Sequence, residues 1–268
     1  MHLGGSEGLS YENILVEKED AVLLITLNRP KAMNALSQAL LAELLQALKE
    51  AEEDAQIKSI IIAGAEKFFC AGADISEVNK VTSPFSGYDY SQQFHRAFTE
   101  VERCKKPVIA AVRGLVLGGG LELMLSCDFQ IVADDARVGV PEVNIGALPA
   151  GGGTVKLPRI MGAAKAKEML LLGDPISGKE AEALGLVNKA VPADQVLAEA
   201  RSLAAKLARK PPLVLQVIKA VVYNTEGMDL RTALDVEAQG LSILAASEDF
   251  VEGTSAFLQK RKPEFKGR

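Results

Sequence analysis

Two glycine-rich turns, each with an acidic residue close by, contain the residues of this chain best suited to chemistry. The first turn, residues 69–75, includes Ala71-Gly72-Ala73-Asp74, and the second is a run of three glycines, 118–120, followed by Glu122. Glu142, preceded by a proline, lies 20 residues beyond Glu122. Glycines let the backbone approach a ligand closely, so two such turns can direct two N–H groups at one carbonyl oxygen. Two nearby glutamates can then act as acid and base, which predicts an enzyme acting next to a carbonyl group.

Each of these motifs, taken alone, also fits a purely structural role. A glycine turn is an ordinary connection from a strand to a helix, and an acidic residue near a helix N-terminus stabilises the helix dipole. Proline is common at the first helical position, so Pro141-Glu142 also fits an ordinary helix start. A dinucleotide-binding turn is a further alternative, but the second turn lacks the required Gly-x-Gly-x-x-Gly spacing.

Composition and charge narrow the class of protein. The chain has 268 residues, of which 48% are hydrophobic, and its formal net charge is −5, so a large core is possible and nucleic acid is a poor candidate partner. Three scattered cysteines and two histidines suggest neither a disulfide framework nor a metal site. The N-terminal residues have no signal or transit pattern, and no apolar run is long enough to span a membrane. We therefore predict a cytoplasmic protein with no membrane partner.

Hydrophobic patterning predicts an α/β fold with mostly parallel strands. Residues 13–18 and 21–27 predict a β-hairpin, and Ser37 is a suitable cap for a helix whose leucines recur at helical spacing. Short apolar runs without alternation predict strands buried on both faces. These runs cover residues 59–63, 107–112 and 129–133.

The pattern becomes wholly helical near Ala204, which predicts a division of the chain into parts. We expect a flexible tail over residues 1–12, a catalytic core over 13–203 and a C-terminal helical module over 204–268. Residues 81–90, with a proline and a glycine, predict a mobile loop that either lines a substrate tunnel or is simply solvated.

Five segments in order resemble the enoyl-CoA hydratase (crotonase) superfamily, and the likeness extends from about Ile14 to the C-terminus. The segments are residues 27–36, the two glycine turns, Pro141-Glu142 and residues 257–263. The resemblance implies a crotonase (ClpP-like) spiral of ββα units, with C-terminal helices that assemble trimers or hexamers. It also implies an acyl-CoA thioester as substrate, with coenzyme A as the carrier part of the substrate and no further cofactor or metal.

The resemblance assigns roles to individual residues. The N–H groups of Ala73 and Gly119 match the two donors of the family's oxyanion hole, and Glu122 and Glu142 match its two catalytic glutamates. Positions that match contacts to coenzyme A are Lys31, Ala32, Ala71, Asp74, Ile75 and, from a neighbouring subunit, Lys260. The implied reaction is reversible addition of water to the 2-trans double bond of an enoyl-CoA, giving a 3-hydroxyacyl-CoA.

Two positions depart from the family pattern, and three alternative functions remain open. Ala150 stands where the family often has a glycine that holds the water, and Leu241 stands where an aromatic residue covers the coenzyme. The alternatives are an enoyl-CoA isomerase, a hydratase for one branched or aromatic acyl-CoA, and a noncatalytic RNA-binding protein on the same scaffold. The length and branching of the acyl group do not follow from the sequence.

Overall fold

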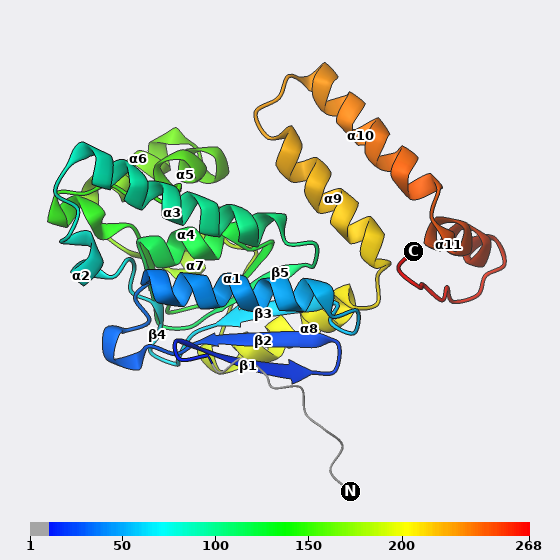
Figure 1. Ribbon diagram of the computed structural model, residues 1–268, viewed down its shortest axis with the longest axis horizontal. Coiled ribbons are helices and arrows are strands. Elements are labelled where there is room, and N and C mark those ends of the chain that lie inside the picture. Colours follow the sequence, from blue (N-terminus) through cyan, green and yellow to red (C-terminus); the bar gives the residue numbers. More distant parts are fainter. Residues whose placement is uncertain (1–10) are drawn as a thin grey trace, which may run out of the picture.

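The computed structural model describes residues 11–268, and in this part the strands form two sheets (Figure 1). The larger sheet has the order β1-β2-β3-β5-β7-β10. Its strands are β1 (Ile14–Glu19), β2 (Val22–Leu27), β3 (Ser59–Ala63), β5 (Val108–Val112), β7 (Phe129–Ala133) and β10 (Lys189–Val191). Only the predicted hairpin of β1 and β2 pairs antiparallel in this sheet, so the predicted α/β class with mostly parallel strands is confirmed within the described residues.

A repeated strand–strand–helix unit builds the second sheet beside the first. Each of β3, β5 and β7 is followed by a short strand of the second sheet and then by helix. The second sheet has the order β4 (Phe68–Cys70), β6 (Leu115–Leu117), β8 (Arg137–Gly139) and β9 (Ile176–Ser177). Because β4, β6 and β8 pair parallel, the turns that follow them lie at the same edge of this sheet. Those turns contain the residues with predicted chemical roles.

The helices that follow these strands form the walls around that edge. After β4 come α2 (Ile75–Val78) and α3 (Pro84–Arg103), and after β6 comes α4 (Gly119–Ser126). The 3-10 helix η2 (Pro141–Ile145), α5 (Gly153–Met161) and α6 (Ala163–Leu172) follow β8. The remaining elements of the core are η1 (Pro30–Ala32), α1 (Gln38–Glu53), α7 (Gly178–Ala183), η3 (Ala193–Gln195) and α8 (Val196–Leu207).

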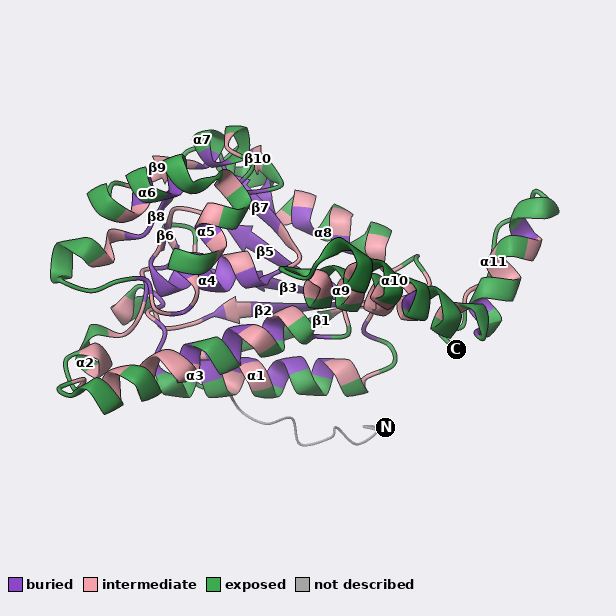
Figure 2. Cartoon of the chain, turned by 90° about the horizontal axis from the view of Figure 1, so that it is seen from above, coloured by how far each residue is buried: buried purple, intermediate pink, exposed green. Residues whose placement is uncertain are grey.

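Burial explains why the central strands lack a polar–apolar alternation. All five residues of β3 and all five of β5 are buried, because helices and the second sheet cover both faces (Figure 2). The hydroxyl of Ser37 accepts the Leu40 N–H at 3.2 Å, as the predicted cap of α1 requires. α1 then buries an apolar stripe against β1, β2 and α3.

Helices α9 (Pro212–Thr225), α10 (Leu230–Ala245) and α11 (Glu248–Leu258) extend away from this core (Figure 1). Figure 2 shows them mostly exposed or half-buried, and many of their large apolar side chains face solvent in the single chain. Lys219 of α9 joins them to the core, since its ammonium contacts Asp128 at 2.5 Å and the Lys106 carbonyl at 3.0 Å. Within the described residues, no helix is both long and apolar enough to cross a membrane.

The change from core to helical module lies beyond the position given by the sequence pattern. Helix α8 continues through residue 204 to Leu207, and its buried Ala200 and Ala204 pack on the sheet. The Ser59 hydroxyl donates to the Ala204 carbonyl at 3.2 Å. A boundary at 203/204 therefore falls inside a core helix, and the visible change occurs between α8 and α9. Of the predicted tail, residues 1–10 lie outside the described part.

The prediction of a loop over residues 81–90 is wrong from residue 84 onward, because α3 begins at Pro84. Ser83 and Ser86 form a capping box, and proline at the first helical position supports the helix start despite Gly87. Val81, Gly87 and Tyr90 do line the cavity described below. The second glycine turn leads directly into α4, which begins at Gly119.

We expect Gly120→Ala to lower the free energy of unfolding by about 2 kcal/mol, because the added Cβ has no space in the packed contact with Cys70. A Cβ on Gly120 would lie 2.6 Å from the Cys70 carbonyl oxygen and 2.7 Å from its Cβ. Gly253→Ala in α11 is the control, since the nearest atom to its Cβ is 3.4 Å away. Urea denaturation at one protein concentration should give a lower midpoint for Gly120→Ala only. Equal midpoints for the two variants would contradict this account of the packing.

Candidate active site

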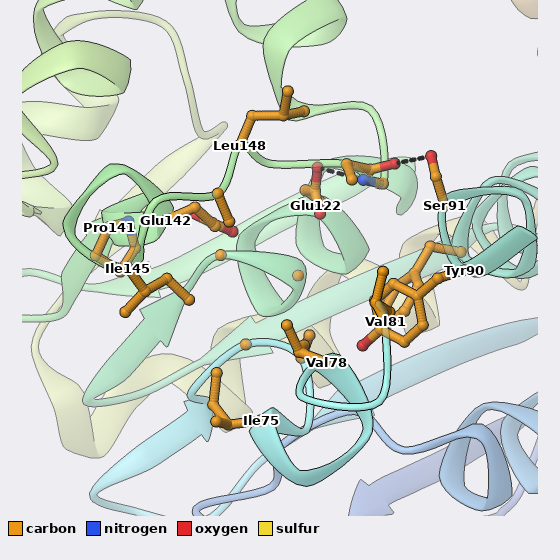
Figure 3. Close-up of a pocket in the computed structure, with 18 of the residues that line it drawn as sticks. Ile75, Val78, Val81, Tyr90, Ser91, Glu122, Pro141, Glu142, Ile145 and Leu148 are labelled. Carbon is orange, nitrogen blue, oxygen red and sulfur yellow. Dashed lines mark hydrogen bonds between the residues drawn. The ribbon is translucent and has the colours of Figure 1, made fainter. Parts of the chain in front are cut away.

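A cavity of about 860 Å³ opens at the edge where β4, β6 and β8 end (Figure 3). Both glycine turns and both predicted catalytic glutamates line it. Apolar side chains from α2, α3, η2 and the adjoining loops make up most of the remaining wall. They include Ile75, Val78, Val81, Tyr90, Ile145 and Leu148.

In the first glycine turn, the N–H of Ala73 donates no hydrogen bond to the described backbone. The Leu36 N–H donates to the Gly72 carbonyl at 2.8 Å, and the Asp74 N–H donates to the Leu36 carbonyl at 2.9 Å. These two bonds use the groups on either side of Ala73, so its own N–H points away from Leu36. Gly72 has a φ of 113°, which a side chain would disfavour. Within residues 11–268 the Ala73 N–H has no hydrogen-bond partner.

The second glycine turn brings another free N–H group to the same place. Gly118, with a φ of 50°, is the N-cap of α4, so Gly119 occupies the first helical position, where N–H groups lack an intrahelical partner. A Cβ on Gly119 would lie 3.4 Å from the Ala73 nitrogen, so the two turns nearly touch. Two adjacent N–H groups, one at a helix N-terminus, can stabilise a negatively charged oxygen.

Glu122 lies one turn into α4 and is almost completely buried, with 2% of its surface exposed. Its Oε1 accepts the Gly151 N–H at 2.8 Å and the Gly153 N–H at 2.7 Å (Figure 3). Burial raises the pKa of Glu122 to about 7; these two N–H groups oppose the rise, and the charge of Glu142 adds to it. A carboxyl group with this pKa can exchange a proton near neutral pH.

Glu142 follows Pro141 at the start of η2 and lines the same cavity from another side (Figure 3). A Cβ on Gly118 would lie 2.4 Å from its Oε1, so only glycine at position 118 leaves room for this carboxyl group. Its Oε2 is buried and has no hydrogen-bond partner among the described residues. Burial raises the pKa of Glu142, which favours the protonated form. The cavity thus contains two carboxyl groups that resist simultaneous ionisation.

The loop before α1 is attached to the first glycine turn. The Ala71 N–H donates to the Met33 carbonyl at 3.0 Å, and the Asn34 side chain donates to the Phe69 carbonyl at 3.1 Å. This attachment fixes the segment that carries the η1 residues Lys31 and Ala32 to the first glycine turn. Lys31 is exposed, while Ala71 and Ile75 line the cavity.

Asp74 has its hydrogen-bonding groups engaged within the protein. Its carboxylate contacts Arg29 at 2.8 Å and caps α2 by accepting the Ser76 N–H at 3.0 Å. Hydrogen bonding from Ser76 and from Arg29 lowers the pKa of Asp74. Its N–H donates to Leu36, and its carbonyl accepts two N–H groups of α2. These contacts favour a role in shaping the turn over the direct coenzyme contact that the sequence suggested.

Lys260 and Leu241 do not reach the cavity of their own chain. Lys260 follows α11 and Leu241 lies in α10, and Figures 1 and 2 both place these helices at the far end from α2 and α6. Leu241 is 59% exposed. Any contact of these residues with a ligand in a cavity therefore requires the cavity of another subunit.

Three contributors to the site were missed in the sequence: Gly151 and Gly153, which bind Glu122, and Ser91. The Ser91 hydroxyl donates to the Ala150 carbonyl at 2.7 Å. The glycine run after Pro149 was a signal for the first two, whereas a serine inside a helix gave none. Ala150 itself is not among the described non-glycine residues with positive φ, so its Cβ fits the backbone without strain. Residues 11–268 contain no group of three His, Cys, Asp or Glu side chains arranged to hold a metal ion.

A spiral of strand–strand–helix units, with two free N–H groups and two carboxyl groups lining one cavity, defines the crotonase class of proteins. The family model described as enoyl-CoA hydratase/isomerase matches residues 17–268. The chain belongs to this family, and the fold predicted from the resemblance is confirmed.

Named relatives cover nearly the whole chain. It is 42% identical over 255 residues to the 2,3-dehydroadipyl-CoA hydratase of Escherichia coli K12. This alignment covers 95% of this chain and 99% of the relative. It is 39% identical over 258 residues to the crotonyl-CoA hydratase of Syntrophomonas wolfei. That alignment covers 96% of this chain and 99% of the relative. The solved enoyl-CoA hydratase of Bacillus anthracis superposes with a TM-score of 0.89 at 38% identity, covering 96% of this chain and 100% of that one.

We expect one glutamate carboxyl group to titrate near pH 7, because burial disfavours the charged form of Glu122. Its carboxyl C=O stretch should disappear from infrared difference spectra as the pH rises through this value. Glu122→Gln should remove the change, whereas Glu12→Gln, at an exposed position, should leave it in place. A wild-type protein with no carboxyl titrating above pH 6 would contradict the assignment.

Proposed function

We propose that this protein is an enoyl-CoA hydratase that adds water reversibly to the 2-trans double bond of an enoyl-CoA thioester. The observation that carries the proposal is that two carboxyl groups, of buried Glu122 and half-buried Glu142, line one cavity with the free N–H groups of Ala73 and Gly119. Hydration needs all of these parts: a base for water, an acid for carbon, and donors for the carbonyl oxygen.

The reaction follows from the movement of charge. The thioester carbonyl oxygen accepts the N–H groups of Ala73 and Gly119. Ionised Glu122 takes a proton from water as the water oxygen bonds to C3, and the electrons of the double bond move toward the carbonyl oxygen. Protonated Glu142 delivers its proton to C2, which completes the addition of one water molecule. The two N–H groups accelerate the step because they bind the enolate-like oxygen more strongly than the ground-state carbonyl.

The surroundings of each glutamate support these roles. Two N–H groups hold the Glu122 carboxylate in place and favour its ionised form, whereas Glu142 Oε2 has no donor among the described residues. The N–H of Ala150, beside the Gly151 donor, is available for the water, since alanine retains this group. Glu122 is the residue that an isomerase does not need, so its elaborate support favours hydration over isomerisation.

The coenzyme part of the substrate binds along the first turn and the loop before α1 in this proposal. Lys31 and Ala32 lie on the loop attached to Ala71. In this proposal the Ala71 carbonyl accepts a hydrogen bond from the adenine. Ile75 lines the cavity next to this turn. The mostly apolar wall fits an acyl chain, and the relatives named for dehydroadipyl-CoA and crotonyl-CoA act on acyl groups of different length. The net charge of −5 weighs against the RNA-binding alternative.

Helices α9–α11 complete a trimer or a hexamer in this proposal. Their exposed apolar side chains need cover that the single chain does not provide. Such an assembly would bring Lys260 to the coenzyme phosphates in a neighbouring subunit's site, and Leu241 to the coenzyme itself. The cytoplasmic location stays a prediction from the sequence.

The direct test follows the loss of absorbance of the conjugated thioester when crotonyl-CoA is mixed with the protein. We expect wild-type protein to hydrate it without added metal or nucleotide. Glu122→Gln and Glu142→Gln should each lower kcat by roughly 10²-fold or more, because each removes a proton-transfer group. Full activity of Glu122→Gln would favour the isomerase alternative. No turnover by wild type of short, medium, branched or aromatic enoyl-CoA would refute the proposal.

We expect Lys260→Glu to raise KM for the thioester with little change in kcat, because it removes binding that is equal in the ground and transition states. The rise should shrink at high salt, since exposed charges are screened. Lys262→Glu, which reverses an equally exposed neighbouring charge, is the control. An unchanged KM at low ionic strength, or light scattering that shows a stable monomer, would contradict the role of Lys260 across an interface.

A further inference from the structure

Helix α3 donates one hydrogen bond to the loop that binds Glu122. Ser91 lines the cavity, and its Oγ donates to the Ala150 carbonyl at 2.7 Å. The same peptide unit carries the Gly151 N–H, which donates to Glu122 Oε1 at 2.8 Å. A continuous chain of hydrogen bonds therefore runs from α3 through one peptide group to the buried carboxylate of α4.

We infer that Ser91 is a positioning residue for Glu122, acting through the Ala150–Gly151 peptide; the inference rests on the proposed role of Glu122 as base. A donor at the carbonyl end of a peptide polarises the group and strengthens the bond made by its N–H end. The Ser91 hydroxyl also fixes the rotation of the peptide plane, so the Gly151 N–H stays directed at the carboxylate.

The loop has no side chain at position 151 that could form a further hydrogen bond to hold this peptide. A Cβ on Gly151 would lie 2.5 Å from Phe98 and 2.6 Å from Glu122 Oε2, so position 151 has no space for an anchoring side chain. Gly152 has a φ of 118°, in the region that glycine enters freely. The second N–H bound to Glu122 comes from Gly153, inside α5, and is independent of Ser91. Loss of the Ser91 hydroxyl should therefore weaken one of the two bonds to Glu122 and leave the other.

Other charged or titratable groups face Glu122 from the elements around α4. Glu142 faces it from η2, and Lys156 of α5 pairs with Glu102 of α3 and donates to the Ser126 hydroxyl at 2.9 Å. His95 of α3 lies with Nε2 3.3 Å from Ser91 Oγ and is exposed. Because His95 contacts the Ser91 hydroxyl, it needs its own control in the experiment.

The test compares Ser91→Thr with Ser91→Val, two side chains of nearly equal shape of which only threonine keeps the hydroxyl. With crotonyl-CoA, Ser91→Val and Ser91→Ala should lower kcat by roughly fivefold, the effect of one lost hydrogen bond, with KM within about twofold of wild type. Their acid limb of kcat/KM should move to higher pH, because a weaker bond from Gly151 disfavours the carboxylate. Ser91→Thr should resemble wild type in rate and in pH profile.

Gln92→Ala, on the same helix and away from the cavity wall, should leave rate and profile unchanged, and His95→Gln should leave the acid limb in place. An acid limb that does not move in Ser91→Val, or one that moves equally in Ser91→Thr, would overturn the inference. Infrared titration of the Glu122 carboxyl in the same variants measures the shift without turnover. It therefore tests the role of Ser91 even if wild type does not hydrate enoyl-CoA, the result that would refute the proposed function instead.

Discussion

The carboxyl group of Glu122 is removed from water, and the two N–H groups that replace its hydration come from a loop about 30 residues further along the chain. Burying the ionised carboxyl group without hydrogen-bond donors would cost several kcal/mol, so the group would stay protonated. The hydrogen bonds therefore join α4 to the segment that carries Gly151 and Gly153, and α3 and α5 contact that segment. Much of the cavity wall belongs to elements that this one interaction brings together.

The glycines around the cavity are explained by the close approach of neighbouring groups to their backbone, rather than by a need for flexibility. At Gly118 a side chain would occupy the space of the Glu142 carboxyl, at Gly120 it would meet Cys70, and at Gly151 it would meet Glu122 and Phe98. Each contact joins two elements distant in sequence. The result is a cavity whose acid, base and N–H donors are positioned before a substrate arrives, which is the condition for electrostatic stabilisation of a transition state.

The core and the C-terminal helices obey different constraints. The core buries its central strands β3 and β5 completely. Helices α9–α11 instead keep large apolar side chains exposed, and the ion pair of Lys219 and Asp128 is one of their links to the core. Asp128 also accepts the Val108 N–H at the start of β5, so the pair connects α9 to the central sheet. The single chain thus contains all four groups of the proposed proton-transfer site, while the residues expected to cover the coenzyme lie on helices directed elsewhere.

Much of the fold was determined by local sequence: the Ser37 cap, the hairpin, and the continuous apolar runs of β3, β5 and β7 all reflect propensity and burial over a few residues. The two glycine turns and both glutamates were recognisable because glycine and carboxyl groups have few alternatives in such positions. The boundary after α8 and the start of α3 were misjudged, since packing on the sheet and a serine capping box outweighed the composition. Only the tertiary structure decided that Ser91, Gly151 and Gly153 act on Glu122, because hydrogen bonds between residues 29 to 59 positions apart leave no periodic pattern in the chain.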